Sequence, residues 1–164
     1  MRLRLFLGLA LLGVAAAQTA APPKPAMKAA AMQPVMMTPP DVKWMPAPAP
    51  TGLPGEVQLA VMSGDPAKAG PFVVRLKFAD GGKIPAHWHP TDEHVTVIEG
   101  TLAAGMGDAF DAAALHEFPA GSYVLLPKRM HHFAMGKGDT VVQVHGMGPF
   151  AITYVNAADD PRKK

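Results

Sequence analysis

The sequence predicts an all-β, single-domain fold, and three observations support that prediction. A chain of 164 residues has the length of one domain. From Gly55 onward, short runs alternate apolar and polar residues, as strands with one buried face do. Gly, Pro and Asp interrupt these runs about every eight to twelve residues, a spacing typical of β-sandwiches and barrels.

The first segment, residues 1–17, has the pattern of an export signal. Arg2 and Arg4 form a positive end, residues 3–14 are an apolar run, and small residues follow for cleavage near Ala17. The mature protein is therefore expected to be periplasmic or secreted. It is expected to have no transmembrane domain, because no second apolar run follows. An uncleaved N-terminal anchor is the alternative interpretation.

Residues 18–50 are predicted to form a disordered linker rich in Pro, Ala and Met. Proline removes backbone donors and restricts the chain, so helix and sheet hydrogen bonding is not expected here. The methionines raise the hypothesis that this arm binds Cu(I) through thioethers, the alternative being a linker with incidental methionines. They are Met27, Met32, Met36, Met37 and Met45.

Residues 51–164 are predicted to form the folded domain. Residues 71–78 alternate most clearly, with four large apolar side chains on one face. Residues 108–116 are predicted to contain one helical turn, because three consecutive alanines lie there. A turn at Glu99-Gly100 is expected to join two separate strands. The expected strands are 56–62, 71–78, 93–99, 101–106, 123–126, 132–135, 140–145 and 150–155.

Charge and cysteine content exclude several classes of function. The chain has 15 basic and 13 acidic residues, and loss of Arg2 and Arg4 with the export signal leaves 13 of each. A neutral chain lacks the basic surface that nucleic-acid backbones require, so no nucleic-acid partner is predicted. The absence of cysteine excludes disulfides and a lipid-modified cysteine anchor.

The candidate site lies in residues 81–100, GGKIPAHWHPTDEHVTVIEG. His87 and His89 are two apart, so on an extended strand both side chains leave the same face. Glu93 follows a Pro-Thr-Asp corner, and an antiparallel return brings its carboxylate over the two imidazoles. Imidazoles and a carboxylate form a common ligand set for one divalent transition-metal ion, here Fe, Mn, Ni, Cu or Zn.

The same stretch resembles the first signature of the cupin superfamily, G(X)5HXH(X)3,4E(X)6G, at every fixed position. Residues 121–136, GSYVLLPKRMHHFAMG, resemble in part the second signature, G(X)5PXG(X)2H(X)3N. Gly121, Pro127 and His132 fit it, whereas Arg129 and Gly136 stand where the pattern has Gly and Asn.

The resemblance implies a small, exported, single-domain bacterial cupin. Its expected fold is a double-stranded jelly-roll barrel with a metal site inside. The second signature adds His132, rather than its neighbour His131, as a fourth ligand beside His87, His89 and Glu93. The resemblance also implies a homodimer, in which a strand near 42–45 or 56–62 joins the sheet of the partner.

Three further residues are candidates for contact with a metal-bound water or a substrate. Gln143 and His145 are two apart on the expected strand 140–145, so both could face the cavity. Arg129 lies in the turn of the second signature, where it could contact an anionic substrate. The alternatives are a sheet-exposed Gln and His and a solvated turn Arg.

Two functional hypotheses remain open from the sequence. Four protein ligands leave about two positions open on a six-coordinate ion, which permits either chemistry or ligand binding. The first hypothesis is a metal-dependent oxidoreductase, dioxygenase-like or oxidase-like, that acts on a small organic molecule. The second is a non-catalytic protein that binds a metal or a small ligand.

Overall fold

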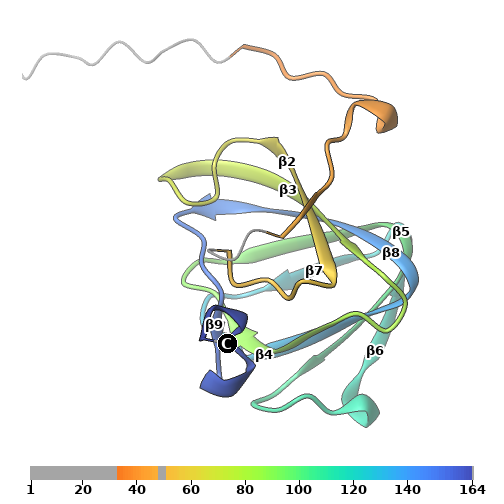
Figure 1. Cartoon of the computed structure of the whole chain (residues 1–164), viewed down its shortest axis with the longest axis vertical. Coiled ribbons are helices and arrows are strands. Elements are labelled where there is room, and N and C mark those ends of the chain that lie inside the picture. Colours follow the sequence, from red (N-terminus) through yellow and green to blue (C-terminus); the bar gives the residue numbers. More distant parts are fainter. Residues whose placement is uncertain (1–32, 48–50, 164) are drawn as a thin grey trace, which may run out of the picture. The chain divides into compact units, whose positions relative to one another are not determined.

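Strands dominate the computed structural model, which describes residues 33–47 and 51–163 (Figure 1). No α-helix occurs in these two ranges, which confirms the predicted all-β class. None of their helical turns is long and apolar enough to cross a membrane. The short 3₁₀ helices are η1 Pro39–Asp41, η3 Ala112–Ala114, η4 Ala157–Asp159 and η5 Pro161–Lys163. The strands are β1 Met45–Pro46, β2 Val57–Ser63, β3 Gly70–Phe78, β4 Lys83–Trp88, β5 Glu93–Met106, β6 His116–Pro119, β7 Tyr123–Leu126, β8 His132–Gly148 and β9 Thr153–Tyr154.

The long strand β8 organises the sheet, because it pairs antiparallel with β3, β4 and β5. The hydrogen-bonded order is β1-β2-β3-β8-β4-β9, and β5 also pairs with β6 and β7. β5 and β8 run side by side for most of their lengths and curl, so the sheet closes around an interior (Figure 1). This arrangement confirms the predicted jelly-roll barrel.

The structure corrects the prediction that a turn at Glu99-Gly100 separates two strands. Residues 93–106 form the single strand β5, whose register against β8 shifts on both sides of Glu99. Gly100 has φ +70°, and a Cβ there would collide with the carbonyl oxygen of Asp139. The glycine therefore allows a β-bulge that bends the strand without ending it. Similarly, residues 132–135 and 140–145 belong to one strand, β8.

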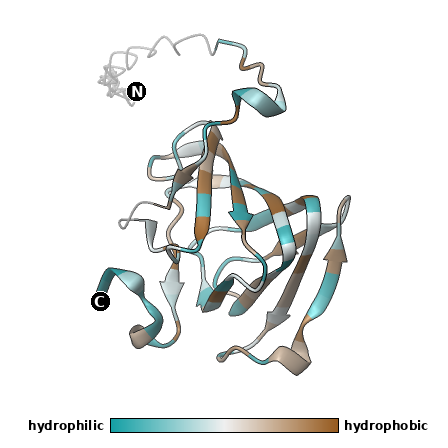
Figure 2. Ribbon diagram, turned by 45° about the vertical axis from the view of Figure 1, so that its right-hand side comes forward, coloured by the Kyte–Doolittle hydropathy of each residue, from teal (hydrophilic) through white to brown (hydrophobic). Residues whose placement is uncertain are grey.

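The helical turn and the core agree with the sequence pattern. Residues 112–114 form η3, and the side chain of Asp111 accepts a hydrogen bond from Ala113 N at 2.9 Å. Along the strands, apolar and polar residues alternate (Figure 2). The side chains that face inward from β3 are all buried: Phe72, Val74, Leu76 and Phe78. Val61 alternates with the buried Val57 and Leu59 but is 43% exposed, and the register of β2 shifts beside it.

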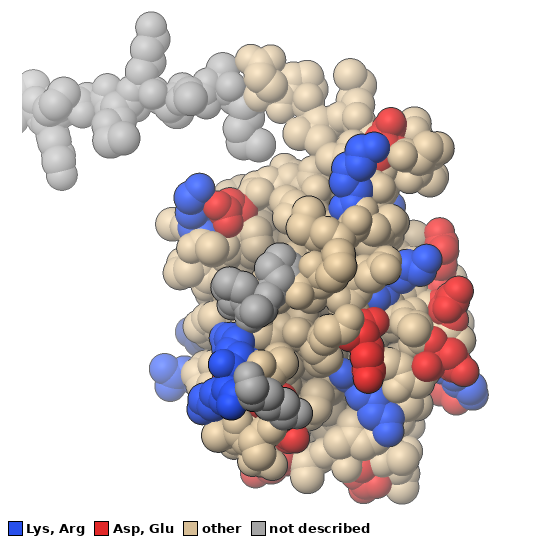
Figure 3. All heavy atoms as spheres, viewed as in Figure 1, with Lys and Arg blue, Asp and Glu red and all other residues tan. Residues whose placement is uncertain are grey.

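The segment before β2 is partly described. β1 pairs with β2 of the same chain at two positions, Met45 opposite Leu59 and Pro46 opposite Gln58. This pairing departs from the expected lack of sheet hydrogen bonding before residue 51. The export signal at 1–17 and most of the linker, residues 18–32 and 48–50, lie outside the described residues. On the face drawn in Figure 3, basic and acidic side chains are interspersed, and several of them lie next to one another.

Candidate metal centre

Three strands bring the four predicted ligands together inside the barrel. His87 lies near the end of β4, and Pro90 turns the chain so that β5 begins at Glu93. His132 is the first residue of β8 and lies opposite His87 in the antiparallel register. His89, just beyond β4, stacks on the ring of Phe150, with ring centroids 4.1 Å apart. The four residues are 3–7% exposed.

The ring nitrogens of the three histidines converge. The nitrogens that His87, His89 and His132 offer lie within 4.8 Å of one another, a spacing at which one ion can serve all three. Glu93 Oε2 lies 3.2 Å from His132 Nε2 and 3.5 Å from His89 Nε2. Residue 131, the neighbour of His132, is not in this cluster. Its Nδ1 lies 2.6 Å from Asp108 Oδ1 at the surface.

Backbone carbonyls hold all three imidazoles in the same tautomer. Nδ1 of each ring lies 2.7–2.9 Å from a carbonyl oxygen: His87 to Pro85, His89 to Ala151 and His132 to Met130. A carbonyl oxygen only accepts hydrogen bonds, so each Nδ1 must donate, and each neutral ring carries its lone pair on Nε2. Metal-ligating histidines are oriented in this way by their outer hydrogen bonds.

The inward nitrogens have no adequate protein partners. His89 Nε2 is buried without a hydrogen-bond partner among the described residues. The neutral ring of His132 turns an acceptor, Nε2, toward the carboxylate of Glu93 at 3.2 Å, and only the protonated ring could donate a hydrogen bond across this contact. Buried unpaired acceptors are costly, and a cation bound between them would satisfy every one of these atoms. The donor set therefore fits a divalent transition metal.

The pKa shifts of three of these residues also favour the protonation states that bind a metal. Burial, followed by the charges of His132 and His89, holds the pKa of His87 well below its usual range. Burial lowers the pKa of His89, although the neighbouring Glu93 opposes the shift. For Glu93, burial raises the pKa, but the charge of His89 and the hydrogen bond and charge of His132 outweigh it and lower the pKa. Neutral imidazoles and an ionised carboxylate are the forms that ligate metals.

These shifts predict how the stability of the metal-free protein depends on pH. Below the ordinary histidine pKa of 6.5, the unfolded chain takes up protons that buried His87 and His89 resist. The free energy of unfolding should therefore fall as pH decreases from about 6.5, because the unfolded state binds more protons. Glu93 adds a loss in the same direction below its ordinary pKa of 4.5.

Urea unfolding of chelator-treated protein, at about pH 8 and about pH 5.5, measures this dependence. His87→Gln should weaken it, whereas His116→Gln, at an exposed position, should leave it unchanged. Equal stability at both pH values would contradict this assignment of the buried neutral rings.

A cavity of about 410 Å³ opens onto the cluster. His87, His89 and Glu93 line its inner part, and the remaining walls are mainly apolar. This volume is within the range of small-molecule sites in proteins, which combine apolar walls with a few polar groups. The apolar walls include Leu59, Phe72, Val74, Ile84, Val144 and Phe150.

The structure corrects the expectation that Gln143 and His145 contribute to the site. Val142 and Val144 fill the inward positions of β8, so the residues between and after them point to the outer face. There Gln143 Oε1 accepts a hydrogen bond from Arg75 Nε at 3.3 Å. The ring of His145 stacks on that of His94, with centroids 4.7 Å apart.

Arg129 also lies away from the cavity. It is exposed, and its guanidinium carbon is 6.0 Å from the centre of the Trp88 ring. Its backbone has φ +63°, the left-handed region that favours glycine, which explains why the cupin pattern has glycine here. Its N–H donates to the carbonyl of His89 at 2.8 Å, so the turn still supports the site.

One residue that lines the cavity was not predicted from the sequence. Arg162, in η5, lines the same cavity as His87, His89 and Glu93. In the sequence it is the first residue of an Arg-Lys-Lys run, which has no periodicity to indicate a role. The only local indication of a fixed position for Arg162 was Asp160, two residues earlier, because an acidic and a basic residue so close in sequence can form an ion pair.

Comparisons with known proteins agree with this geometry. The family model of the ChrR cupin-like domain matches residues 32–151. Germin-like protein subfamily 3 member 3 of Arabidopsis thaliana is 34% identical over 70 residues, and auxin-binding protein ABP19b of Prunus persica is 32% identical over 69 residues. Each alignment covers 42% of this chain, and this chain spans only 33% of each relative.

Solved structures share the fold at low sequence identity. The polyketide cyclase RemF of Streptomyces resistomycificus superposes with a TM-score of 0.63 at 18% identity, covering 81% of this chain and 92% of RemF. A putative acetylacetone dioxygenase of Methylibium petroleiphilum superposes with a TM-score of 0.60, also at 18% identity, covering 82% and 90%. At such identity the likeness concerns the fold alone.

Proposed function

The chain belongs to the ChrR cupin-like domain family, and from this membership and the convergent imidazoles we propose that it is a metal-dependent enzyme acting on a small organic molecule. His87, His89, Glu93 and His132 are the proposed ligands of one divalent transition-metal ion. The observation that carries the proposal is the opening of a mainly apolar cavity of about 410 Å³ directly onto His87, His89 and Glu93.

The proposed reaction is an oxidation of the dioxygenase or oxidase type. When bound, the ion would supply Lewis-acid and redox chemistry at the inner end of the cavity. The protein contributes the rest: Nδ1 hydrogen bonds fix the three rings, and apolar side chains such as Phe72 and Val144 exclude water and hold an apolar substrate. The description of one structural neighbour as a putative acetylacetone dioxygenase supports this class of reaction.

Oxygen consumption tests the proposal. Protein loaded anaerobically with Fe(II) or Mn(II) should consume O2 with at least one member of a panel of diketones, phenols and organic acids. The His87→Ala variant, which lacks one ligand, is the matched control. If no compound raises O2 uptake above that of the variant, the catalytic proposal is wrong.

Non-catalytic binding of a small ligand is the second candidate. Support for it comes from the cavity itself and from relatives named as auxin-binding proteins. In that case panel compounds should bind to the metal-loaded protein, as measured by calorimetry, and be recovered unchanged.

Export and self-association complete the proposal. The positive and apolar pattern of residues 1–17 supports a periplasmic or secreted location. A homodimer is proposed by analogy with the way sheet edges pair between subunits. Fractionation of cells and light scattering of the purified protein measure the two properties.

A further inference from the structure

We propose that Arg162 forms a carboxylate-binding subsite in the outer part of the cavity, so that the preferred ligand is a small monocarboxylate with an apolar body. This inference rests on the proposed function in one respect, namely that the cavity is the ligand site. It adds the chemical class of the ligand. Arg162 lines the same cavity as His87 and Glu93.

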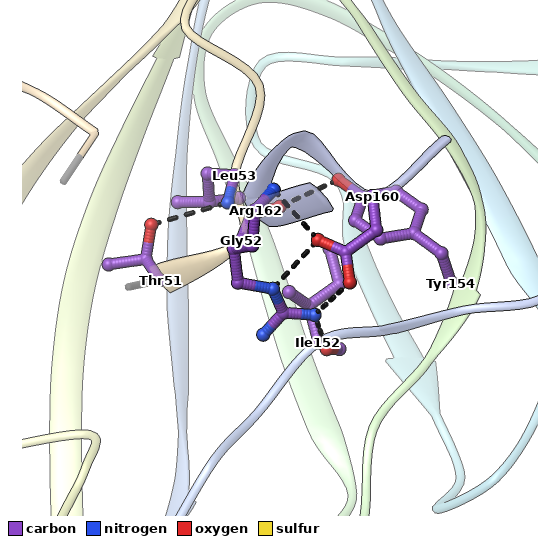
Figure 4. Close-up of polar contacts among 7 residues, drawn as sticks. All are labelled: Thr51, Gly52, Leu53, Ile152, Tyr154, Asp160 and Arg162. Carbon is purple, nitrogen blue, oxygen red and sulfur yellow. Dashed lines mark hydrogen bonds and ion pairs between the residues drawn. The ribbon is translucent and has the colours of Figure 1, made fainter. Parts of the chain in front are cut away.

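The guanidinium is held in a fixed orientation (Figure 4). Its Nε donates to Asp160 Oδ1 at 2.7 Å, and its Nη2 donates to Asp160 Oδ2 at 2.9 Å. Nη2 also donates to the carbonyl oxygen of Ile152 at 3.0 Å. Asp160 is only 6% exposed and its ion pair with Arg162 holds its pKa below the usual range, so it stays ionised. A pre-oriented arginine loses little freedom when it binds a ligand.

The backbone leaves room for this arrangement. Gly52 has φ +74°, and a Cβ added there would lie 2.9 Å from the Arg162 guanidinium carbon. The absence of a side chain at Gly52 thus lets the guanidinium lie against the backbone. The hydroxyl of Tyr154 donates to the carbonyl of Gly52 at 2.8 Å and holds that segment in place.

The free donors on Nη1 of Arg162 indicate the chemical class of the ligand. Asp160 and Ile152 engage Nε and Nη2, whereas Nη1 has no hydrogen-bond partner among residues 33–47 and 51–163. Nη1 carries two N–H donors and no acceptor, and charged arginine donors bind carboxylates more strongly than neutral acceptors. Arg162 is the only Lys or Arg that lines this cavity in the described part of the chain. Because the other walls are mainly apolar, the rest of the ligand should be apolar.

The alternative is that Arg162 has only a structural role and holds the backbone at Ile152, the residue before β9. Ile152 follows Ala151, whose carbonyl accepts the hydrogen bond from His89. If Arg162 has only this structural role, its substitution should change the metal content and should weaken the binding of charged and neutral ligands alike. If Arg162 binds a carboxylate, its substitution should weaken the binding of carboxylate ligands alone. The two roles can therefore be separated.

Binding of matched carboxylates and primary amides tests the subsite. The probes are aromatic and branched monocarboxylic acids of about six to ten carbons and their amides, titrated calorimetrically into the metal-loaded full-length protein. The wild type should bind the acids about 10-fold more tightly than the amides, as expected for a hydrogen bond to a charged group. Arg162→Gln should abolish this preference and keep the metal content, and Arg162→Lys should keep part of it.

Two further variants make the result decisive. Arg162→Gln leaves the buried Asp160 without its partner, so the double variant Asp160→Asn/Arg162→Gln serves if the single variant does not fold. Arg129→Gln, which changes an exposed arginine outside the cavity, should keep the full preference. Equal binding of acids and amides by the wild type, or an unchanged preference in Arg162→Gln, would overturn the inference.

The inference and the proposed function can fail separately. Preference for acids that depends on Arg162, without O2 uptake, would uphold the subsite and refute the oxidation. O2 uptake with neutral compounds, without preference for acids, would uphold the oxidation and refute the carboxylate subsite.

Discussion

His132→Ala is expected to lower the affinity for a divalent transition-metal ion by about 100-fold. Metal sites with four protein ligands contribute roughly 10–16 kcal/mol, so one ligand accounts for about 3 kcal/mol, or about 100-fold in the dissociation constant. The Nε2 of His132 faces the same point as those of His87 and His89, and no other described histidine can replace it. Competition with a chromophoric chelator measures the affinity.

His131→Ala provides a control that differs by one position in the sequence. The ring of His131 pairs with Asp108 and lies outside the cluster, so its removal should leave the affinity within about twofold of wild type. If both variants bind the metal equally well, or if His131→Ala alone loses it, the assignment of ligands is wrong.

Removal of the metal is expected to lower the melting temperature by roughly 10–20 °C. A ligand that binds only the folded state stabilises it by about 4 kcal/mol at a thousandfold excess over its dissociation constant. In a domain of this size, 1 kcal/mol corresponds to about 2–6 °C. The decrease in melting temperature should be large because removal of the ion leaves the buried Nε2 of His89 without a partner. Thermal unfolding with and without a chelator measures the change.

The His87→Ala variant distinguishes loss of the metal from other effects of the chelator. Since it lacks a ligand, its melting temperature should respond little to the chelator. A wild-type protein that melts at the same temperature after complete metal removal, verified by elemental analysis, would show that the ion does not stabilise the fold.

Local sequence patterns were sufficient to predict the arrangement at the centre of the barrel. The two-residue spacing of His87 and His89 and the turn at Pro90 are local features. In the structure the centroids of the two rings are 4.9 Å apart, and His89 Nε2 lies 3.5 Å from Glu93 Oε2. The position of His132 depends on a contact between distant strands, which a single sequence does not show. The register of the second signature supplied that information, and the structure places His132 opposite His87.

The residues around the centre were harder to predict. Gln143 and His145 were candidates for the cavity because of their two-residue spacing, with a sheet-exposed position as the alternative, and spacing does not say which face is inward. The buried Val142 and Val144 determine that, because successive residues of a strand face opposite sides. Arg162 could not be predicted, since its place in the cavity depends on the backbone at Gly52 and on the carbonyl of Ile152.

The lengths of β5 and β8 were also beyond the sequence pattern. Glu99-Gly100 was interpreted as a turn between two strands, although an isolated glycine within a strand pattern also marks β-bulges. In the structure β8 continues past this position and keeps pairing with β5 on both sides of it, so the chain bends instead of reversing. Tertiary pairing decided the outcome at a position where the local preference favoured a turn.

The location of the ion in a crystal of metal-loaded protein tests the central claim most directly. Anomalous diffraction at the absorption edge of the loaded metal should show one peak about 2.0–2.3 Å from the Nε2 atoms of His87, His89 and His132 and from one oxygen of Glu93. If a saturated crystal has its principal peak elsewhere and leaves the three Nε2 atoms without an ion, these residues are not a metal centre.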